Sequence, residues 1–233
     1  MKIFITTGAL ALSISAINAA TLAEYNFNGG SGTTLDYSAT TTDAGATASA
    51  VSPTGTFVRS GSDLNGVTGG GSLAAQFQSV GKEPPPISGT AAQSYITFTV
   101  GAAGPGQALS LTSLSFLTNL SSNLASGAFY TLQYGSASTP SSFINLSLSP
   151  STVQTSQTIV TRTADLSEID FSAFTTGVTF RINITQPTDS ENTGTASARI
   201  DTINVQGSVI PEPGTISLFV ASAVFGLLRR RRK

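Results

Sequence analysis

Three carboxylates close together in the sequence are the residues best placed to perform acid–base chemistry. Asp165, Glu168 and Asp170 form the densest acidic cluster of the chain, and a glycosidase needs two carboxylates at a controlled separation. Spacing along the sequence does not fix that separation, and Asp165 followed three residues later by Glu168 also fits a capping box on a helix of one or two turns. Asp189 and Glu191 lie in a predicted turn, where they are most simply solvating residues. A carbohydrate-active enzyme using Asp or Glu is therefore an alternative function and not the leading one.

A second set of oxygen ligands lies near the two ends of the predicted domain. Glu24 and Asn26 come early in the chain and Asp201 comes late, and carboxylate and amide oxygens are ligands that calcium prefers. Structural calcium ions often lie where the terminal strands of carbohydrate-binding jelly rolls meet. Three side chains are too few for calcium unless backbone carbonyls join them. A calcium-stabilised carbohydrate-binding module is thus a second alternative, and no other cofactor is expected.

Aromatic and threonine side chains offer two further kinds of surface. Tyr130 and Tyr134 share one face of a predicted strand and could stack on sugars, but Leu132 lies on the same face, which favours a place in the core. Threonines recur on the outward faces of two strands, at Thr97, Thr99, Thr179 and Thr185. Regular threonine arrays can order water, as an ice-binding surface does, but these positions follow no fixed repeat.

The composition excludes several reaction classes. The chain of 233 residues contains no His, no Cys and no Trp, which excludes a Ser-His-Asp triad, a cysteine nucleophile and a His or Cys zinc site. Residues 21–210 contain five basic and eleven acidic residues, a net charge of −6. Nucleic acid requires a basic surface, so it is not expected as a partner. We therefore expect a protein that is not an enzyme.

Short alternating apolar patterns recur along residues 21–210, separated by breaks that contain Gly or Pro. The predicted strands are 23–27, 56–58, 73–77, 95–100, 109–116, 129–134, 143–148, 157–163, 178–185 and 197–205. The alternation in 109–116 slips by one residue near Thr112, which indicates a β-bulge. The stretch 33–52 is interpreted as a surface excursion with at most one weak strand. This all-β pattern predicts one antiparallel β-sandwich domain, and the well-formed first and last strands favour a jelly roll.

The chain begins like a secretory signal peptide. Lys2 precedes the apolar stretch 3–17, and Asn18, Ala19 and Ala20 supply small residues for cleavage. We expect residues 1–20 to be the signal peptide, cut after Ala19 or Ala20, and residues 21–210 to be the exported domain.

The last segment, 211–233, combines three features in a fixed order. Pro211, Glu212 and Pro213 come first, the uncharged stretch 216–228 follows, and the chain closes on a basic cluster of Arg229, Arg230, Arg231, Arg232 and Lys233. As a helix the uncharged stretch would be about 20 Å long, whereas the core of a bilayer is about 30 Å thick. Arginines that snorkel to the surface narrow this difference. The basic cluster favours a cytoplasmic end, which places the domain on the far side of the inner membrane.

This tail resembles the PEP-CTERM sorting signal of exported bacterial proteins, a signal also found on some ice-binding proteins. The resemblance covers 23 of the 233 residues. It implies an exosortase as processing partner, transient anchoring in the inner membrane by a short hydrophobic helix, and release to the cell surface or extracellular matrix. The association of such tails with exopolysaccharide implies a matrix or biofilm role. The leading expectation is a structural or adhesive surface protein with weak carbohydrate binding.

Overall fold

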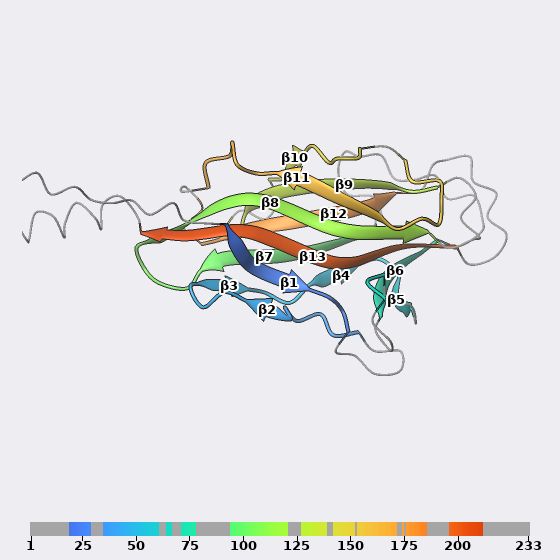
Figure 1. Ribbon diagram of the computed structural model, residues 1–233, viewed down its shortest axis with the longest axis horizontal. Coiled ribbons are helices and arrows are strands. Elements are labelled where there is room, and N and C mark those ends of the chain that lie inside the picture. The colour runs from blue at the N-terminus through green and yellow to red at the C-terminus, as the bar shows by residue number, and fades with distance from the viewer. Residues whose placement is uncertain are drawn as a thin grey trace, which may run out of the picture.

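The computed structural model describes residues 19–28, 35–60, 64–66, 71–77, 94–120, 127–138, 142–151, 153–171, 174, 176–185 and 196–211. Within these ranges the chain is built from strands, and no helix is present (Figure 1). The strands are β1 (Ala20–Tyr25), β2 (Thr41–Thr42), β3 (Ala46–Ala48), β4 (Ser52–Thr54), β5 (Phe57–Ser60), β6 (Ser72–Phe77), β7 (Ser94–Ala102), β8 (Gln107–Leu120), β9 (Phe129–Ser136), β10 (Ile144–Leu146), β11 (Val160–Asp165), β12 (Val178–Thr185) and β13 (Ala196–Pro211).

The strands form two antiparallel sheets that pack face to face (Figure 1). Sheet A has the order β11-β8-β13-β1-β2, with β6 pairing β13 and β5 pairing β6; sheet B has the order β10-β9-β12-β7-β3, with β4 also pairing β7. Their central strands, β11-β8-β13-β1 and β10-β9-β12-β7, have the order of a jelly roll, in which the first and last strands are neighbours. The predicted jelly-roll β-sandwich is confirmed.

The core lies between the sheets and follows from the alternation in the sequence. On β12, for example, Val178, Phe180, Ile182 and Ile184 are buried, because every second side chain of a strand points to the same face. Aromatic rings join the two layers: the ring centroids of Tyr25 on β1 and Phe98 on β7 are 5.1 Å apart. Such tilted aromatic pairs add stability beyond the apolar area that they bury.

The predicted bulge at Thr112 is confirmed. Gln206 pairs with Ser113 and Gly207 pairs with Leu111, so Thr112 is the extra residue of β8. The strands approach closely here, since a Cβ on Gly207 would lie 2.3 Å from the carbonyl oxygen of Ser110. A residue with a side chain could not occupy this position without displacing β8.

Several predicted strand bounds are wrong. The predicted strand 157–163 begins at Val160 instead, because the side-chain Nε2 of Gln154 donates to the carbonyls of Ser156 and Thr158 and bends the chain before it (3.2 and 2.8 Å). The predicted strand 143–148 shortens to β10, and the last strand runs on from Val205 to Pro211 along β8. The first strand begins at Ala20, which pairs with Gly207.

The stretch 33–52 was predicted to hold at most one strand, yet β2 and β3 lie within it and β4 begins at its end. These strands are short and pair on the sheet edges, β2 with β1 and the other two with β7. An edge strand needs hydrogen bonds on one side only and can be exposed on both faces. Its sequence therefore lacks the alternation that marks a strand over the core.

One arginine lies inside the sandwich. Arg162 is 1% exposed and its side chain points inward from β11. Its Nε donates to the hydroxyl of Thr118 (3.3 Å), its NH1 group donates to the carbonyl of Pro150 (2.6 Å), and its guanidinium lies 4.8 Å from the ring centroid of Tyr130. The Thr118 hydroxyl also donates to the side-chain oxygen of Gln154 (2.6 Å). This buried cluster ties β8 and β11 to the segment 150–154.

Candidate functional site

The outer face of sheet B carries the densest set of polar and aromatic side chains that the core does not use. The inward residues of its central strand β12 are buried, so Thr179, Arg181, Asn183 and Thr185 point outward. The pairing places Arg181 beside Gln133 of β9 and Thr97 of β7. Side chains from three strands therefore meet around Arg181.

Arg181 lies against two aromatic rings. The guanidinium carbon is 3.7 Å from the ring centroid of Phe143, which immediately precedes β10, and 4.7 Å from that of Tyr95 on β7. Both distances are within the range of a cation–π contact. All three side chains are half-buried, so each keeps part of its surface open to solvent. Tyr95, Arg181 and Phe143 are called the aromatic–arginine row below.

A chain of amides runs beside this row. Gln133 donates from Nε2 to Oδ1 of Asn145 (2.8 Å), and Asn183 donates from Nδ2 to Oε1 of Gln133 (3.2 Å) and to the hydroxyl of Thr131 (3.2 Å). Each of the three amides comes from a different strand, and the hydrogen bonds run from Asn183 to Gln133 and from Gln133 to Asn145. The Oδ1 atom of Asn183 is buried and lacks a hydrogen-bond partner in the part of the chain that the structure describes. A buried acceptor left without a donor is costly, so this oxygen is available to a donor from water or from a ligand.

The predicted threonine face lies on the same surface. The hydroxyls of Thr99 and Thr179 bond to each other (2.8 Å), and that of Thr97 donates to the carbonyl of Ser52 (3.4 Å). These hydroxyls are directed to protein groups and are not arranged as a free array. The ice-binding interpretation stays a prediction without support from this geometry.

The two tyrosines considered for sugar stacking belong to the core, as the sequence favoured. Tyr130 is 4% and Tyr134 8% exposed, and the hydroxyl of Tyr130 donates to the carbonyls of Asn119 and Arg199 across the sandwich (both 3.3 Å). Burial raises the pKa of Tyr130, and the neighbouring Arg162 partly opposes that shift.

The acidic cluster lies on an exposed turn after β11 and includes no helix. The predicted helix of one or two turns is therefore wrong. Asp165 accepts hydrogen bonds from the backbone N–H and the hydroxyl of Ser167 (2.9 and 2.7 Å), and the turn closes between Ile169 and Leu166 (3.1 Å). These bonds, the backbone one first, hold the pKa of Asp165 below its ordinary value. A general acid requires the opposite shift. Glu168 and Asp170 are exposed on the same turn.

Two of the predicted calcium ligands, Glu24 and Asp201, lie on adjacent strands, because β1 pairs with β13, and Asn26 follows the end of β1. Each accepts a hydrogen bond from the protein: Asp201 from the backbone of Leu64 (2.9 Å) and of Thr202 (2.7 Å), Glu24 from the amide of Asn204 (3.5 Å), and Asn26 from the backbone of Asn28 (3.2 Å). Asp201 is fully buried. It supports Thr202, which has a φ of 42°, a conformation that a β-branched residue rarely adopts.

We expect calcium to leave the melting temperature of the protein unchanged, because the carboxylate of Asp201 already accepts hydrogen bonds from backbone N–H groups. The described residues also contain no group of three or more acidic side chains able to hold a metal ion. The measurement is a thermal melt in a chelator and again in millimolar calcium. A calcium-dependent rise that Asp201→Asn abolishes and Asp36→Asn does not would contradict this expectation and restore the calcium module.

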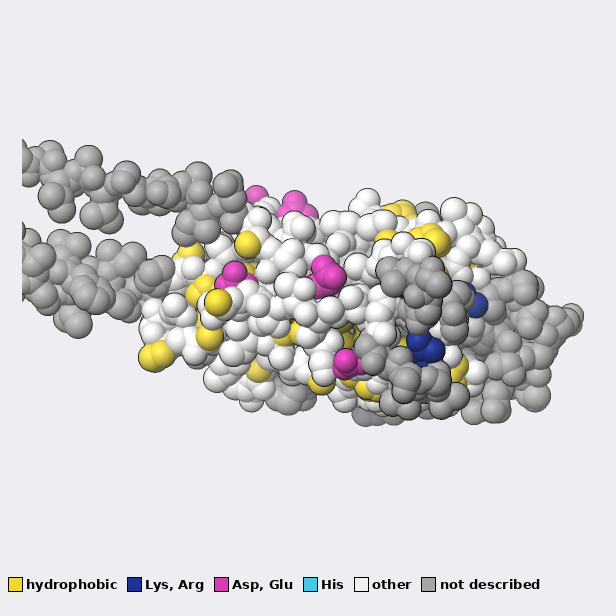
Figure 2. Space-filling model, turned by 60° about the horizontal axis from the view of Figure 1, so that its bottom comes forward, with side chains coloured by type: hydrophobic (Ala, Val, Ile, Leu, Met, Phe, Trp, Pro, Cys, Tyr) yellow, Lys and Arg dark blue, Asp and Glu magenta, His cyan; other side chains and the backbone are white. Residues whose placement is uncertain are grey.

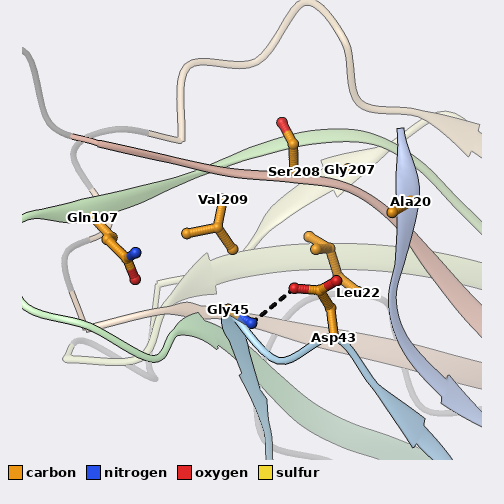
Figure 3. Close-up of a pocket in the computed structure, with 8 residues that line it drawn as sticks. All are labelled: Ala20, Leu22, Asp43, Gly45, Gln107, Gly207, Ser208 and Val209. Atoms are coloured by element: carbon orange, nitrogen blue, oxygen red, sulfur yellow. Dashed lines mark hydrogen bonds between the residues drawn. The ribbon is translucent and has the colours of Figure 1, made fainter. Parts of the chain in front are cut away.

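A pocket of about 300 Å³ lies where β1 begins and β13 approaches its end (Figure 3). Asp43 is its one carboxylate, and that group accepts a hydrogen bond from the backbone N–H of Gly45 (2.8 Å). The remaining lining is apolar apart from the amide of Gln107 and the hydroxyl of Ser208, so the pocket holds no pair of titratable groups for acid–base catalysis. On the face that Figure 2 presents, the acidic side chains are likewise separate from one another.

Other predicted residues lie outside the described ranges. These are Asp189 and Glu191, the rest of the sorting motif after Pro211 (Glu212 and Pro213), residues 1–18 of the predicted signal peptide, the C-terminal helix, and the basic cluster 229–233. Pro211 itself ends β13 and pairs with Gln107. In the described ranges no helix of a length and hydropathy suited to crossing a membrane is found.

Sequence reasoning missed the aromatic–arginine row. The alternation in 178–185 puts Arg181 on the same outward face as Thr179 and Thr185, but nothing in the sequence showed that Tyr95 and Phe143 would converge on it. One signal was present: the outward residues of 178–185 combine a lone arginine with an amide. A solvated strand face without such a site would rather carry several charges.

No family model matches the chain and no curated protein matches it. Among solved structures, a similar chain comes from work on "the promiscuous specificity of the carbohydrate-binding modules from the beta-sandwich super family". The two chains share 14% sequence identity with a TM-score of 0.39, and the match covers 69% of this chain and 56% of that chain. This chain thus spans just over half the length of that structure. We infer its function from its own side chains.

Proposed function

We propose that the protein is an exported β-sandwich that binds an extracellular polysaccharide on the outer face of sheet B. The observation that carries the proposal is the aromatic–arginine row beside the amides of Asn145, Gln133 and Asn183. Sugars are recognised by flat aromatic surface for their C–H faces and by amide and guanidinium groups for their hydroxyls. The face supplies both kinds of group on the rigid strands of one sheet.

The same proposal includes the route of the protein to its ligand. The signal peptide expected over 1–20 and the PEP-CTERM-like tail support export, anchoring at the inner membrane and release by an exosortase. A polysaccharide-binding face suits a protein that becomes part of an exopolysaccharide matrix. Its role there is adhesive or structural, with each contact weak and many contacts adding through avidity along one polymer.

Truncating either ring of the row should weaken polysaccharide binding about tenfold, the loss expected for a central aromatic contact worth somewhat more than 1 kcal/mol. The measurement is affinity electrophoresis of the full chain through gels that contain bacterial, plant or neutral glucan polysaccharides, followed by calorimetry on those that retard it. The variants are Tyr95→Ala and Phe143→Ala.

Ile144→Ala is the matched control. Ile144 neighbours Phe143 in the sequence and is 56% exposed, but it alternates to the opposite side of β10. Its removal should leave the affinity unchanged. Retardation that survives both ring truncations, or a chain that no polysaccharide retards, would contradict the proposed function.

A further inference from the structure

We infer that the polysaccharide bound on this face is an acidic one, and that the carboxylate of a uronic acid unit pairs with the guanidinium of Arg181. This inference rests on the proposed function and specifies its ligand. Three observations support it: the face carries a positive charge, the Nε donor of Arg181 has no acceptor among the described residues, and amide groups lie beside the guanidinium.

The charge of the face is isolated and positive. In the described strands of sheet B, Arg181 is the one charged residue: β3, β4, β7, β9, β10 and β12 contain no Asp, Glu or Lys. The domain as a whole is acidic, with a net charge of −6 over 21–210. At physiological salt a charge acts over about 8 Å, so an anion on this face responds to Arg181 and not to distant carboxylates.

Aromatic rings hold the guanidinium of Arg181 in place. The described residues offer Nε of Arg181 no hydrogen-bond acceptor, and the guanidinium is held by the rings of Phe143 and Tyr95. A planar guanidinium offers a fork of donors that matches a carboxylate in two parallel hydrogen bonds. The rings fix the plane of the fork before the ligand arrives, which reduces the entropy lost on binding.

Arg162 shows what this chain does with an arginine that serves the fold. Its Nε and NH1 groups donate to Thr118 and to Pro150, and it is enclosed in the core. Arg181 is only half-buried, and no described residue accepts a hydrogen bond from its Nε. The two arginines lie on different sheets, and Arg181 is on the outer face while Arg162 is in the core.

The neighbouring groups suit a sugar that carries the carboxylate. The unpartnered Oδ1 of Asn183 can accept from a hydroxyl, and the exposed Asn145 stands at the other end of the amide chain. A single cation beside hydroxyl-binding amides matches one negative charge on each sugar unit. A polymer with clustered sulfate groups would call for several cations instead.

The test compares two forms of one polymer that differ only in charge: polygalacturonate, and the same polymer with its carboxylates methyl-esterified. Calorimetry with the full chain should show affinity at least about tenfold higher for the free acid, with the difference shrinking as salt is raised. Arg181→Gln should make the two affinities equal. Arg181→Lys should recover part of the preference, since it restores the charge without the fork.

The outcomes separate this inference from the proposed function. Equal affinity of the wild-type chain for both forms, with Tyr95→Ala weakening both, would overturn the inference and leave polysaccharide binding intact. Failure to bind either form, or any other polysaccharide tried, would overturn both. Equal or tighter binding of a sulfated glucan would overturn the assignment of a carboxylate. Circular dichroism of Arg181→Gln checks that the sandwich is folded.

Discussion

Replacing Arg162 with Ala should lower the free energy of unfolding by about 2–5 kcal/mol, the range seen when a long buried side chain is truncated to alanine and leaves a cavity. The guanidinium fills space between β11 and the ring of Tyr130 and donates to Thr118 and Pro150. Its loss leaves a cavity and removes a donor from the buried hydroxyl of Thr118, whereas the carbonyl of Pro150 belongs to an exposed residue. Each unsatisfied buried group costs about 1–3 kcal/mol.

The measurement is urea unfolding of the full chain, followed by far-UV circular dichroism. Arg162→Met separates the two causes, because it fills most of the space without restoring the hydrogen bonds and should lose less than the alanine variant. Arg181→Ala is the matched control: it removes an arginine on the outer face of sheet B that makes two cation–π contacts, and it should cost about 1–2 kcal/mol, less than Arg162→Ala. If Arg162→Ala lost no more than Arg181→Ala, the buried cluster would not contribute to the stability of the fold.

The fold was predictable because its signals are local. The alternation in 178–185 identified β12, and the phase slip at Thr112 identified the bulge before any partner strand was known. The jelly-roll prediction needed one further assumption, that the first and last strands pair. What failed depended on contacts from elsewhere, as where the amide of Gln154 binds two carbonyls and delays the start of β11.

The candidate site was less predictable because the register of strand pairing decides which of its side chains meet. Tyr95, Phe143 and Arg181 are far apart in the sequence, and a shift of one residue in any pairing would move a ring to the other face. Asp201 shows the reverse case. Its residue type suggested a calcium ligand, but in the structure its carboxylate accepts hydrogen bonds from the backbone N–H groups of Leu64 and Thr202. No local sequence pattern reveals these contacts.

Arg162 illustrates the same limit from inside the core. An arginine on a strand is expected to point to solvent, since burying its charge is costly. Here it points inward because Thr118, Gln154 and the carbonyl of Pro150 form a polar lining around it. Thr118 lies on β8, and Gln154 and Pro150 lie in the segment 150–154, more than 30 residues further along the chain. Only the folded structure shows that they meet.

In native cells, the protein should lose every residue beyond its sorting motif, and the Glu212→Ala/Pro213→Ala variant should keep its C-terminus at Lys233. The physical reason is that a processing enzyme needs an extended, accessible segment, which a Pro-Glu-Pro element provides. β13 remains paired with β8 up to Pro211, so a cut at or after Pro211 leaves the sandwich whole. The variant retains Pro211 for that reason.

Intact mass spectrometry of the protein isolated from the cell envelope and from the medium measures this outcome. The wild-type mass should match a chain that begins at Ala20 or Thr21 and ends at or soon after Pro211, and it should appear outside the inner membrane. Gln206→Ala, on an exposed position of β13, controls for effects on the strand itself and should be processed normally. A mass that includes Lys233 in both wild type and variant would mean that the tail is a plain anchor. In that case polysaccharide binding would take place at the outer surface of the inner membrane and not in the matrix.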